Sequence, residues 1–132
     1  MSNVFKDVLD FHSAFGLNIG THPQIPEDIN ERTLRMDLLE EEYNEYLEAE
    51  EKADIVGIAD ALGDMIYIIC GTAASYGIPL QEVFEEIHRS NMAKLVDGKV
   101  IRRADGKVLK PEGWKPPNIE YILKKHNVGG NI

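Results

Sequence analysis

Several features that define other protein classes are scarce or missing in this 132-residue chain. It has one cysteine, Cys70, so no intramolecular disulfide can form, and we interpret Cys70 as a small core residue. Lysine and arginine number 14 against 23 aspartates and glutamates, and the net charge of −9 argues against nucleic acid or an anionic membrane as the main partner. A Gly-rich phosphate loop, a Ser-His-Asp set and histidines at metal-ligand spacing are also missing. At this length we expect one domain over residues 1–132.

Targeting signals are missing as well. The N-terminal sequence MSNVFKDVLDFH has no basic segment followed by an apolar core, so we expect no signal peptide. A long uncharged run follows Asp64, but glycine, serine, threonine and proline interrupt it, and we expect it to be too short and too broken to span a bilayer. These observations predict a cytoplasmic protein without a membrane partner.

Charge is unevenly distributed along the chain. Residues 1–64 carry 4 basic and 16 acidic side chains, for a net charge of −12, whereas residues 65–132 carry 10 and 7, for a net of +3. Between Arg89 and Lys115 there are 8 basic residues against 3 acidic ones. An acidic half beside a basic segment is the arrangement that a ligand made of metal ion and phosphate would require.

The first acidic stretch is predicted to be a helix over residues 28–51, which starts at a capping box. At about 100° per residue, Glu42 and Glu45 fall within about 40° of the apolar Leu38, and Glu41 lies about 60° away on the other side. The other acids cluster on a separate, solvated face: Asp37, Glu40, Glu48 and Glu51. Two of the glutamates are therefore predicted to face the protein rather than water.

The next predicted helix, residues 54–76, is apolar on nearly every side and is therefore expected to be buried. Asp60, Asp64 and Tyr67 share one of its faces with Gly71. A buried carboxylate needs a partner, and this helix contains no lysine or arginine. Hard divalent cations bound through carboxylate oxygens meet that need, so we predict Mg²⁺, with Mn²⁺ as a possible substitute.

Three more helices are predicted, over residues 3–15, 79–95 and 118–126. The expected fold is all-α, with a four-helix core and a short C-terminal helix. A near-repeat, DGKV at residues 97–100 and again at 105–108, predicts a β-hairpin, which is either a solvated surface hairpin or a basic flap over phosphates.

The helix over residues 28–51 also carries a second apolar stripe, which includes Met36, Tyr43 and Leu47. Because the stripe with the inward glutamates lies on a different face, two apolar faces imply either a centrally buried helix or a subunit interface.

The two acidic helices together resemble the all-α NTP pyrophosphatase superfamily, which includes MazG-like proteins, dimeric dUTPases and phosphoribosyl-ATP pyrophosphohydrolases. The family pattern is Glu-Glu-x-x-Glu on one helix and Glu-x-x-Asp on the next. RMDLLEEEYNEYLEA contains the first motif at Glu41, Glu42 and Glu45, and DALGDMIYI contains the end of the second at Asp64. The run VFEEIHRSNMAKL and the basic segment after it look like the Cof-like, or dUTPase-like, branch.

The resemblance implies Mg²⁺-dependent hydrolysis of a nucleoside triphosphate to the monophosphate and pyrophosphate, by a homo-oligomer that is a dimer or a tetramer. The metal ligands would be Glu41, Glu42, Glu45, Asp60 and Asp64. Either Glu41 or Glu42 would act as the base that orients water, and Lys94 would stabilise the phosphate charge in catalysis. The residues that bind substrate would be Asn91, Lys94, Arg102, Arg103, Lys107 and Tyr67.

The chain departs from the family pattern at one position. The glutamate of Glu-x-x-Asp would fall on Ala61, and the chain offers Asp60 one residue earlier. Positions three and four residues before Asp64 both lie near it on a helix, so Asp60 could still reach a metal with its shorter side chain.

Other interpretations remain. A non-catalytic, metal-dependent nucleotide-binding module could use the same carboxylates without turnover. A structural helix bundle would need no internal carboxylates, because a Glu-rich run then simply faces water. A ferritin-like di-iron site would need Glu-x-x-His motifs that this chain lacks.

Overall fold

The computed structural model describes residues 3–127, which form five α-helices. The helices are α1 (Val4–Ala14), α2 (Ile29–Glu51), α3 (Ile55–Tyr76), α4 (Leu80–Met92) and α5 (Ile119–Lys125). The all-α class is therefore confirmed, and each predicted helix is present with ends that shift by at most three residues.

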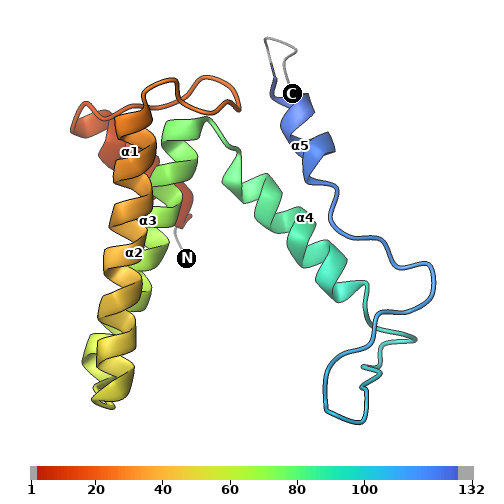
Figure 1. The fold of residues 1–132 in the computed structure, drawn as a ribbon. Coiled ribbons are helices and arrows are strands. Elements are labelled where there is room, and N and C mark those ends of the chain that lie inside the picture. The colour runs from red at the N-terminus through yellow and green to blue at the C-terminus, as the bar shows by residue number, and fades with distance from the viewer. Residues whose placement is uncertain (1–2, 128–132) are drawn as a thin grey trace.

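Helices α1, α2 and α3 pack together as a body, whereas α4 and the chain after it, residues 80–127, form an arm that diverges from the body (Figure 1). Extensive contacts join α2 to α3 and α1 to α3, and a smaller set joins α4 to α5. Helix α4 has no comparable contact with the helices of the body. A single chain therefore does not form the expected four-helix core, because its fourth helix is held away from the other three.

The helices of the body begin at polar side chains. Asn3, Asp28 and Asp54 each have extended backbone, and the side-chain oxygen of each accepts a hydrogen bond from a backbone N–H in the first turn. These bonds satisfy N–H groups that have no partner within the helix, so the sequence sets the three helix starts locally.

Arg35 of α2 joins the two long helices of the body. Its Nε donates to Thr72 Oγ1 at 3.0 Å and its Nη2 donates to the carbonyl oxygen of Ile68 at 2.7 Å, both on α3. Gly71 makes room for this side chain, because a Cβ at that position would overlap the guanidinium. The partly buried guanidinium is thus satisfied by α3, and the bonds set how the two helices align.

The arm leaves the body through a junction at residues 77–79. Gly77 ends α3 with φ of +67°, and its backbone lies so close to His22 that a Cβ would overlap the carbonyl oxygen of His22. The N–H of Ile78 donates to the carbonyl oxygen of Ala73 at 2.9 Å. The junction is therefore packed and hydrogen-bonded, and it sets the direction in which α4 departs.

One side of α4 is covered by the chain that follows it. The indole N–H of Trp114 donates to the carbonyl oxygen of Ser90 at 2.7 Å, and the N–H of Asn118 donates to Glu86 Oε2 at 2.7 Å. Val83 and Ser90 are buried on this side. The arm thus has its own small packed interior.

The predicted β-hairpin is wrong. Within residues 3–127 no strand forms, and the basic segment holds only two isolated antiparallel bridges, between residues 96 and 99 and between 102 and 108. Each Asp-Gly pair makes its own tight turn, with positive φ at Gly98 and Gly106. Because there are two separate turns, each apolar run beside them is too short to form the series of hydrogen bonds that pairs two strands.

Large apolar side chains remain exposed on both the body and the arm. The buried apolar residues of the described chain are mostly small: Val8, Ala49, Ala61, Cys70, Ala73, Ala74, Val83 and Ile122. Helix α2 is not centrally buried, since Met36 is 60% exposed. The accessible surface is 9488 Å², about a third more than the roughly 7,000 Å² expected of a compact monomer of 14.9 kDa.

Helix α3 is also exposed over much of its apolar surface. With 22 residues and a mean hydropathy of 1.6, it is long and apolar enough to cross a membrane by length and composition alone. The uncharged run after Asp64 is only part of this helix, and core helices of globular proteins satisfy the same criterion, so the expectation that the run does not span a bilayer stays a prediction. Here α3 carries Asp60 and Asp64 and packs against α1 and α2.

Candidate metal centre

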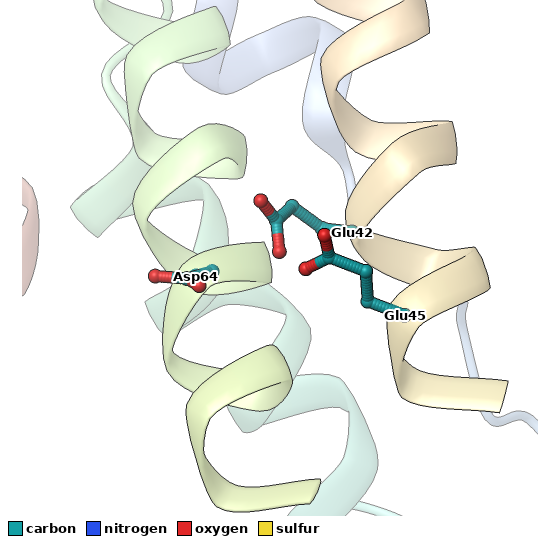
Figure 2. Close-up of side chains that lie close together, drawn as sticks. All are labelled: Glu42, Glu45 and Asp64. Carbon is teal, nitrogen blue, oxygen red and sulfur yellow. The ribbon is translucent and has the colours of Figure 1, made fainter. Parts of the chain in front are cut away.

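Three carboxylates from two helices converge in the body. Glu42 and Glu45 extend from α2 toward α3, where Asp64 lies (Figure 2). One oxygen of each carboxylate can be chosen so that all three lie within 4.8 Å of one another. Oxygens at such separations could share one cation, because the metal–oxygen distances preferred by Mg²⁺ or Ca²⁺ are about 2.0–2.6 Å.

The sequence brings these side chains together through helix periodicity and small residues. Glu42 and Glu45 are three residues apart and therefore lie on one face of α2. Below them α2 and α3 approach closely, since Ala49 is buried and a Cβ at Gly57 would lie 3.1 Å from the Ala49 Cβ. The two helices are thus near enough for carboxylates on α2 to meet the one on α3.

Glu42 has the most unusual electrostatic environment of the three. The pKa of its carboxyl is raised to about 7, first by burial and then by a hydrogen bond with Glu45 and by the charges of Glu45, Asp64 and Glu41. Its Oε2 is buried and accepts no hydrogen bond. A buried carboxylate oxygen without a partner is costly, and a divalent cation would satisfy it. The donor set is all oxygen and negatively charged, so it fits a hard divalent cation.

The other two predicted ligands lie beside this group. Glu41 precedes Glu42 on α2 and is close enough for its charge to raise the pKa of Glu42. Asp60 lies one turn before Asp64 on α3. Neither belongs to the set of three that converge, so their roles as ligands stay predictions.

Tyr67, predicted to bind substrate, packs toward α1. Its ring meets the ring of Phe11 edge-on, with centroids 5.5 Å apart, and 42% of the residue is exposed. It lies on α3 between the carboxylate cluster and the end at which Arg35 binds. The structure therefore gives Tyr67 a packing contact, and its role toward substrate stays a prediction.

Asn91 and Lys94 lie at the end of α4, on the arm. Lys94 Nζ donates to Asn91 Oδ1 at 3.0 Å, and the ammonium is 5.4 Å from the centre of the Trp114 ring. Lys110 lies over the same ring at 5.0 Å. Two ammonium groups on one indole form a positive cluster, which we call the tryptophan cluster (Asn91, Lys94, Lys110 and Trp114).

The sequence interpretation did not assign Trp114 or Lys110 to the site. Trp114 is the chain's single tryptophan and lies in a Pro-rich connection, and this was the one feature of the sequence that could have indicated it.

The other predicted substrate residues also lie on the arm, where Arg102 donates to the carbonyl oxygen of Gly106 at 2.8 Å and Arg103 pairs with Asp105. Lys107 follows in the same turn. Within one chain these residues are on the arm and the acidic cluster is in the body (Figure 1).

Comparison with known proteins gives two matches. The family model for phosphoribosyl-ATP pyrophosphohydrolase matches residues 8–91, which include all three converging carboxylates but stop before Lys94. The uncharacterized protein L479 of Acanthamoeba polyphaga mimivirus is 32% identical over 79 residues. That alignment covers 58% of this chain and 32% of the viral protein, so the chain spans about a third of its relative's length.

Proposed function

The chain belongs to the phosphoribosyl-ATP pyrophosphohydrolase family, part of the all-α NTP pyrophosphatase superfamily, and from this membership we propose that it is a Mg²⁺-dependent nucleoside triphosphate pyrophosphohydrolase. It cleaves a nucleoside triphosphate into the monophosphate and pyrophosphate. Membership in this family implies that the chain is a pyrophosphohydrolase. That its substrate is a nucleoside triphosphate and that it uses Mg²⁺ are our proposals.

The observation that carries the proposal is the convergence of Glu42, Glu45 and Asp64, with a buried oxygen of Glu42 that accepts no hydrogen bond. These three residues would hold Mg²⁺, with Glu41 and Asp60 as further ligands. A divalent cation there would neutralise phosphate charge and acidify a bound water. Mn²⁺ would substitute, since it also prefers oxygen ligands.

The remaining chemistry falls to protein side chains. Glu41 or Glu42 orients the attacking water and accepts its proton as the general base. Lys94 and Asn91 approach the phosphates and stabilise the charge that develops during transfer. Arg102, Arg103 and Lys107 bind the outer phosphates, and Tyr67 completes the substrate site.

The substrate class follows from the chain after Val83, whose sequence resembles the dUTPase-like branch. We propose two alternative roles in the cytoplasm: the hydrolysis of damaged nucleoside triphosphates as a house-cleaning reaction, or a dUTPase-like role. The protein acts as a homo-oligomer, a dimer or a tetramer, supported by the large apolar side chains that one chain leaves exposed.

A nucleotide panel with Mg²⁺, scored separately for pyrophosphate and orthophosphate, tests the proposal. We expect at least one nucleoside triphosphate to yield pyrophosphate, and excess chelator to abolish the reaction. Orthophosphate as the single phosphate product, or full activity in chelator, would refute it. Nucleotide and metal binding without turnover would instead identify a non-catalytic binding module.

A further inference from the structure

The indole of Trp114 has a fixed orientation at the end of α4. Its N–H donates to the carbonyl oxygen of Ser90 at 2.7 Å, and Ser90 is only 1% exposed. The N–H of Lys94, which would bond to that oxygen if α4 continued, donates instead to the carbonyl oxygen of Asn91 at 3.2 Å. The indole therefore replaces a backbone donor of the helix, and this bond sets the direction of the ring.

The backbone before Trp114 is fixed as well. The N–H of Trp114 donates to the carbonyl oxygen of Pro111 at 3.1 Å, and Gly113 between them has φ of +80°. Glycine adopts this left-handed conformation without strain, so the tight turn over residues 111–114 places the ring on α4.

Two ammonium groups share this ring. Nζ of Lys110 lies 5.0 Å from the ring centre, and Nζ of Lys94 lies 5.4 Å from it. Lys94 follows α4 directly, whereas Lys110 belongs to the connection before Trp114. The electron-rich face of an indole attracts a cation without neutralising its charge, so the ring gathers two full positive charges from separate segments.

Neither of these ammonium groups has a carboxylate partner within residues 3–127. The ion pairs there are formed by other cations: Lys6, Lys52, Arg89, Arg103, Lys124, Lys125 and His126. Lys94 donates to a neutral acceptor, Asn91 Oδ1, at 3.0 Å. Like charges that are held together without neutralisation repel each other, and a bound anion would remove that repulsion.

The chemistry of the tryptophan cluster favours a diphosphate group as this anion. Lysine ammonium groups bind phosphate as point charges, and the amide of Asn91, whose oxygen accepts from Lys94, has an NH₂ group that can donate to a phosphate oxygen. The segment from Arg89 to Lys115 has 8 basic residues against 3 acidic ones, so the surroundings are also positive. A diphosphate carries negative charge on two phosphate groups, so each ammonium can contact one of them.

We propose that Trp114 is a positioning residue, which holds the ammonium groups of Lys94 and Lys110 as a pair that binds the diphosphate group of a nucleotide or of free pyrophosphate. Lys110 is then a second phosphate-binding residue beside Lys94. The role of this pair in turnover rests on the proposed function, whereas the binding of a diphosphate does not.

Calorimetric titration with pyrophosphate in excess chelator tests the binding without a metal ion. We expect saturable binding by the wild type and a loss of about tenfold in affinity for Lys110→Met, which keeps an unbranched side chain but removes the charge. Lys115→Met is the matched control, since it removes the same charge from a lysine that does not lie over the ring, and its affinity should stay within about twofold of the wild type. No saturable binding by the wild type, or equal losses in both variants, would overturn the proposal.

Other anions in the same titration define the ligand. Orthophosphate should bind more weakly than pyrophosphate, because it offers a single phosphate group to the two ammonium groups. Equal affinity for both would show a general anion-binding patch and would refute diphosphate recognition. A nucleoside diphosphate that binds more tightly than pyrophosphate assigns the site to the nucleotide, and equal or weaker binding assigns it to free pyrophosphate.

Fluorinated tryptophan tests the positioning role without disturbing the fold. Trp114 is the chain's single tryptophan, so an analogue supplied during expression replaces this residue alone. Fluorine withdraws electron density from the ring face and weakens its attraction for cations, while the shape and the N–H remain. We expect the affinity for pyrophosphate to fall stepwise from tryptophan to monofluoro- and difluorotryptophan, and the ¹⁹F resonance to shift on titration. Unchanged affinity would mean that the ring only packs, which contradicts the proposal.

The variant Trp114→Leu extends the test to turnover. It should raise KM for the triphosphate several-fold and change kcat much less, because the indole acts through lysines that bind the substrate. A purely structural role would lower the active fraction and leave KM unchanged, and that result would overturn the positioning role. If Trp114→Leu does not fold, the fluorinated proteins are assayed in its place. If the wild type hydrolyses no nucleotide, the proposed function fails, and the pyrophosphate titrations still decide this inference.

Discussion

The body and the arm of this protein differ in charge, packing and chemistry. The body is acidic, and its two long helices are joined by Arg35 and by close contact at small residues. The arm is basic between Arg89 and Lys115 and is held together by one tryptophan and a few hydrogen bonds to α4. Carboxylates that can hold a cation lie on one part, and cations that can hold phosphate lie on the other. A metal–phosphate substrate would need both.

The strongest test of this contrast removes a carboxylate of the body. Asp64→Asn or Glu45→Gln should lower kcat/KM for the proposed reaction about a hundredfold or more, about 2.7 kcal/mol of barrier, because the cation loses a charged ligand. Steady-state kinetics and Mg²⁺ titration measure the effect. Glu48→Gln is the matched control, since Glu48 is exposed on α2 and pairs with Lys52. Equal losses in Glu48→Gln would contradict the division of α2 into two acidic faces.

The junction between the two parts can be broken at Gly77. Gly77→Ala should lower the free energy of unfolding by about 2 kcal/mol or more, because alanine at positive φ is strained and its Cβ would overlap His22. Chemical denaturation measures the loss. Gly63→Ala, in open space on α3, should instead raise stability by up to about 1 kcal/mol. An unchanged Gly77→Ala protein would mean that the junction is adaptable.

Asp60 tests how far the acidic site extends along α3. If Asp60 is a ligand, Asp60→Ala should cost activity about tenfold, about 1.4 kcal/mol of barrier. Adding Ala61→Glu places a longer carboxylate three residues before Asp64 and should recover part of the Mg²⁺ affinity. Mg²⁺ titrations of the three proteins compare them. Loss of stability with unchanged Mg²⁺ dependence, and no recovery in the double variant, would show that Asp60 is no ligand.

On the arm, Lys94→Ala should raise KM or lower kcat several-fold and leave Tm nearly unchanged. The side chain contacts Asn91 and the exposed face of Trp114, so its removal opens no core. Kinetics and thermal melting are measured together. Lys124→Ala is the control, because Lys124 pairs with Glu120 on the surface of α5. A large fall in Tm with normal turnover of the folded protein would assign Lys94 to structure alone.

The stability of the body is also expected to depend on pH. The pKa of Glu42 is raised to about 7 in the folded state, so the folded protein binds this proton more tightly than the unfolded chain does. Without divalent cations, this contribution to stability is complete below about pH 4.5 and is lost as the pH rises toward 7. Urea unfolding across this range should show the decline in the wild type and a weaker one in Glu42→Gln. Matching profiles would mean that another group is responsible.

Much of the site within the body could be predicted because it depends on short-range geometry. Glu42 and Glu45 lie three residues apart on α2, and helix periodicity placed both on the face that meets α3. Asp64 stood out because it is charged in an apolar helix. Glu40 was assigned to a solvated face and is exposed in the structure, because the direction of a side chain along a regular helix follows from its position in the sequence.

The sequence by itself determined the five helices, the face of α2 that carries Glu42 and Glu45, and the difference in charge between the two halves, because each depends on residues within a few positions along the chain. The tertiary structure decided what depends on distant contacts. It showed that Gly77 and His22 direct α4 away from the body and that Trp114 gathers Lys94 and Lys110. Neither of these follows from a local pattern. Each requires contact between two segments that are far apart in the chain, and no pattern in the sequence indicates that they meet.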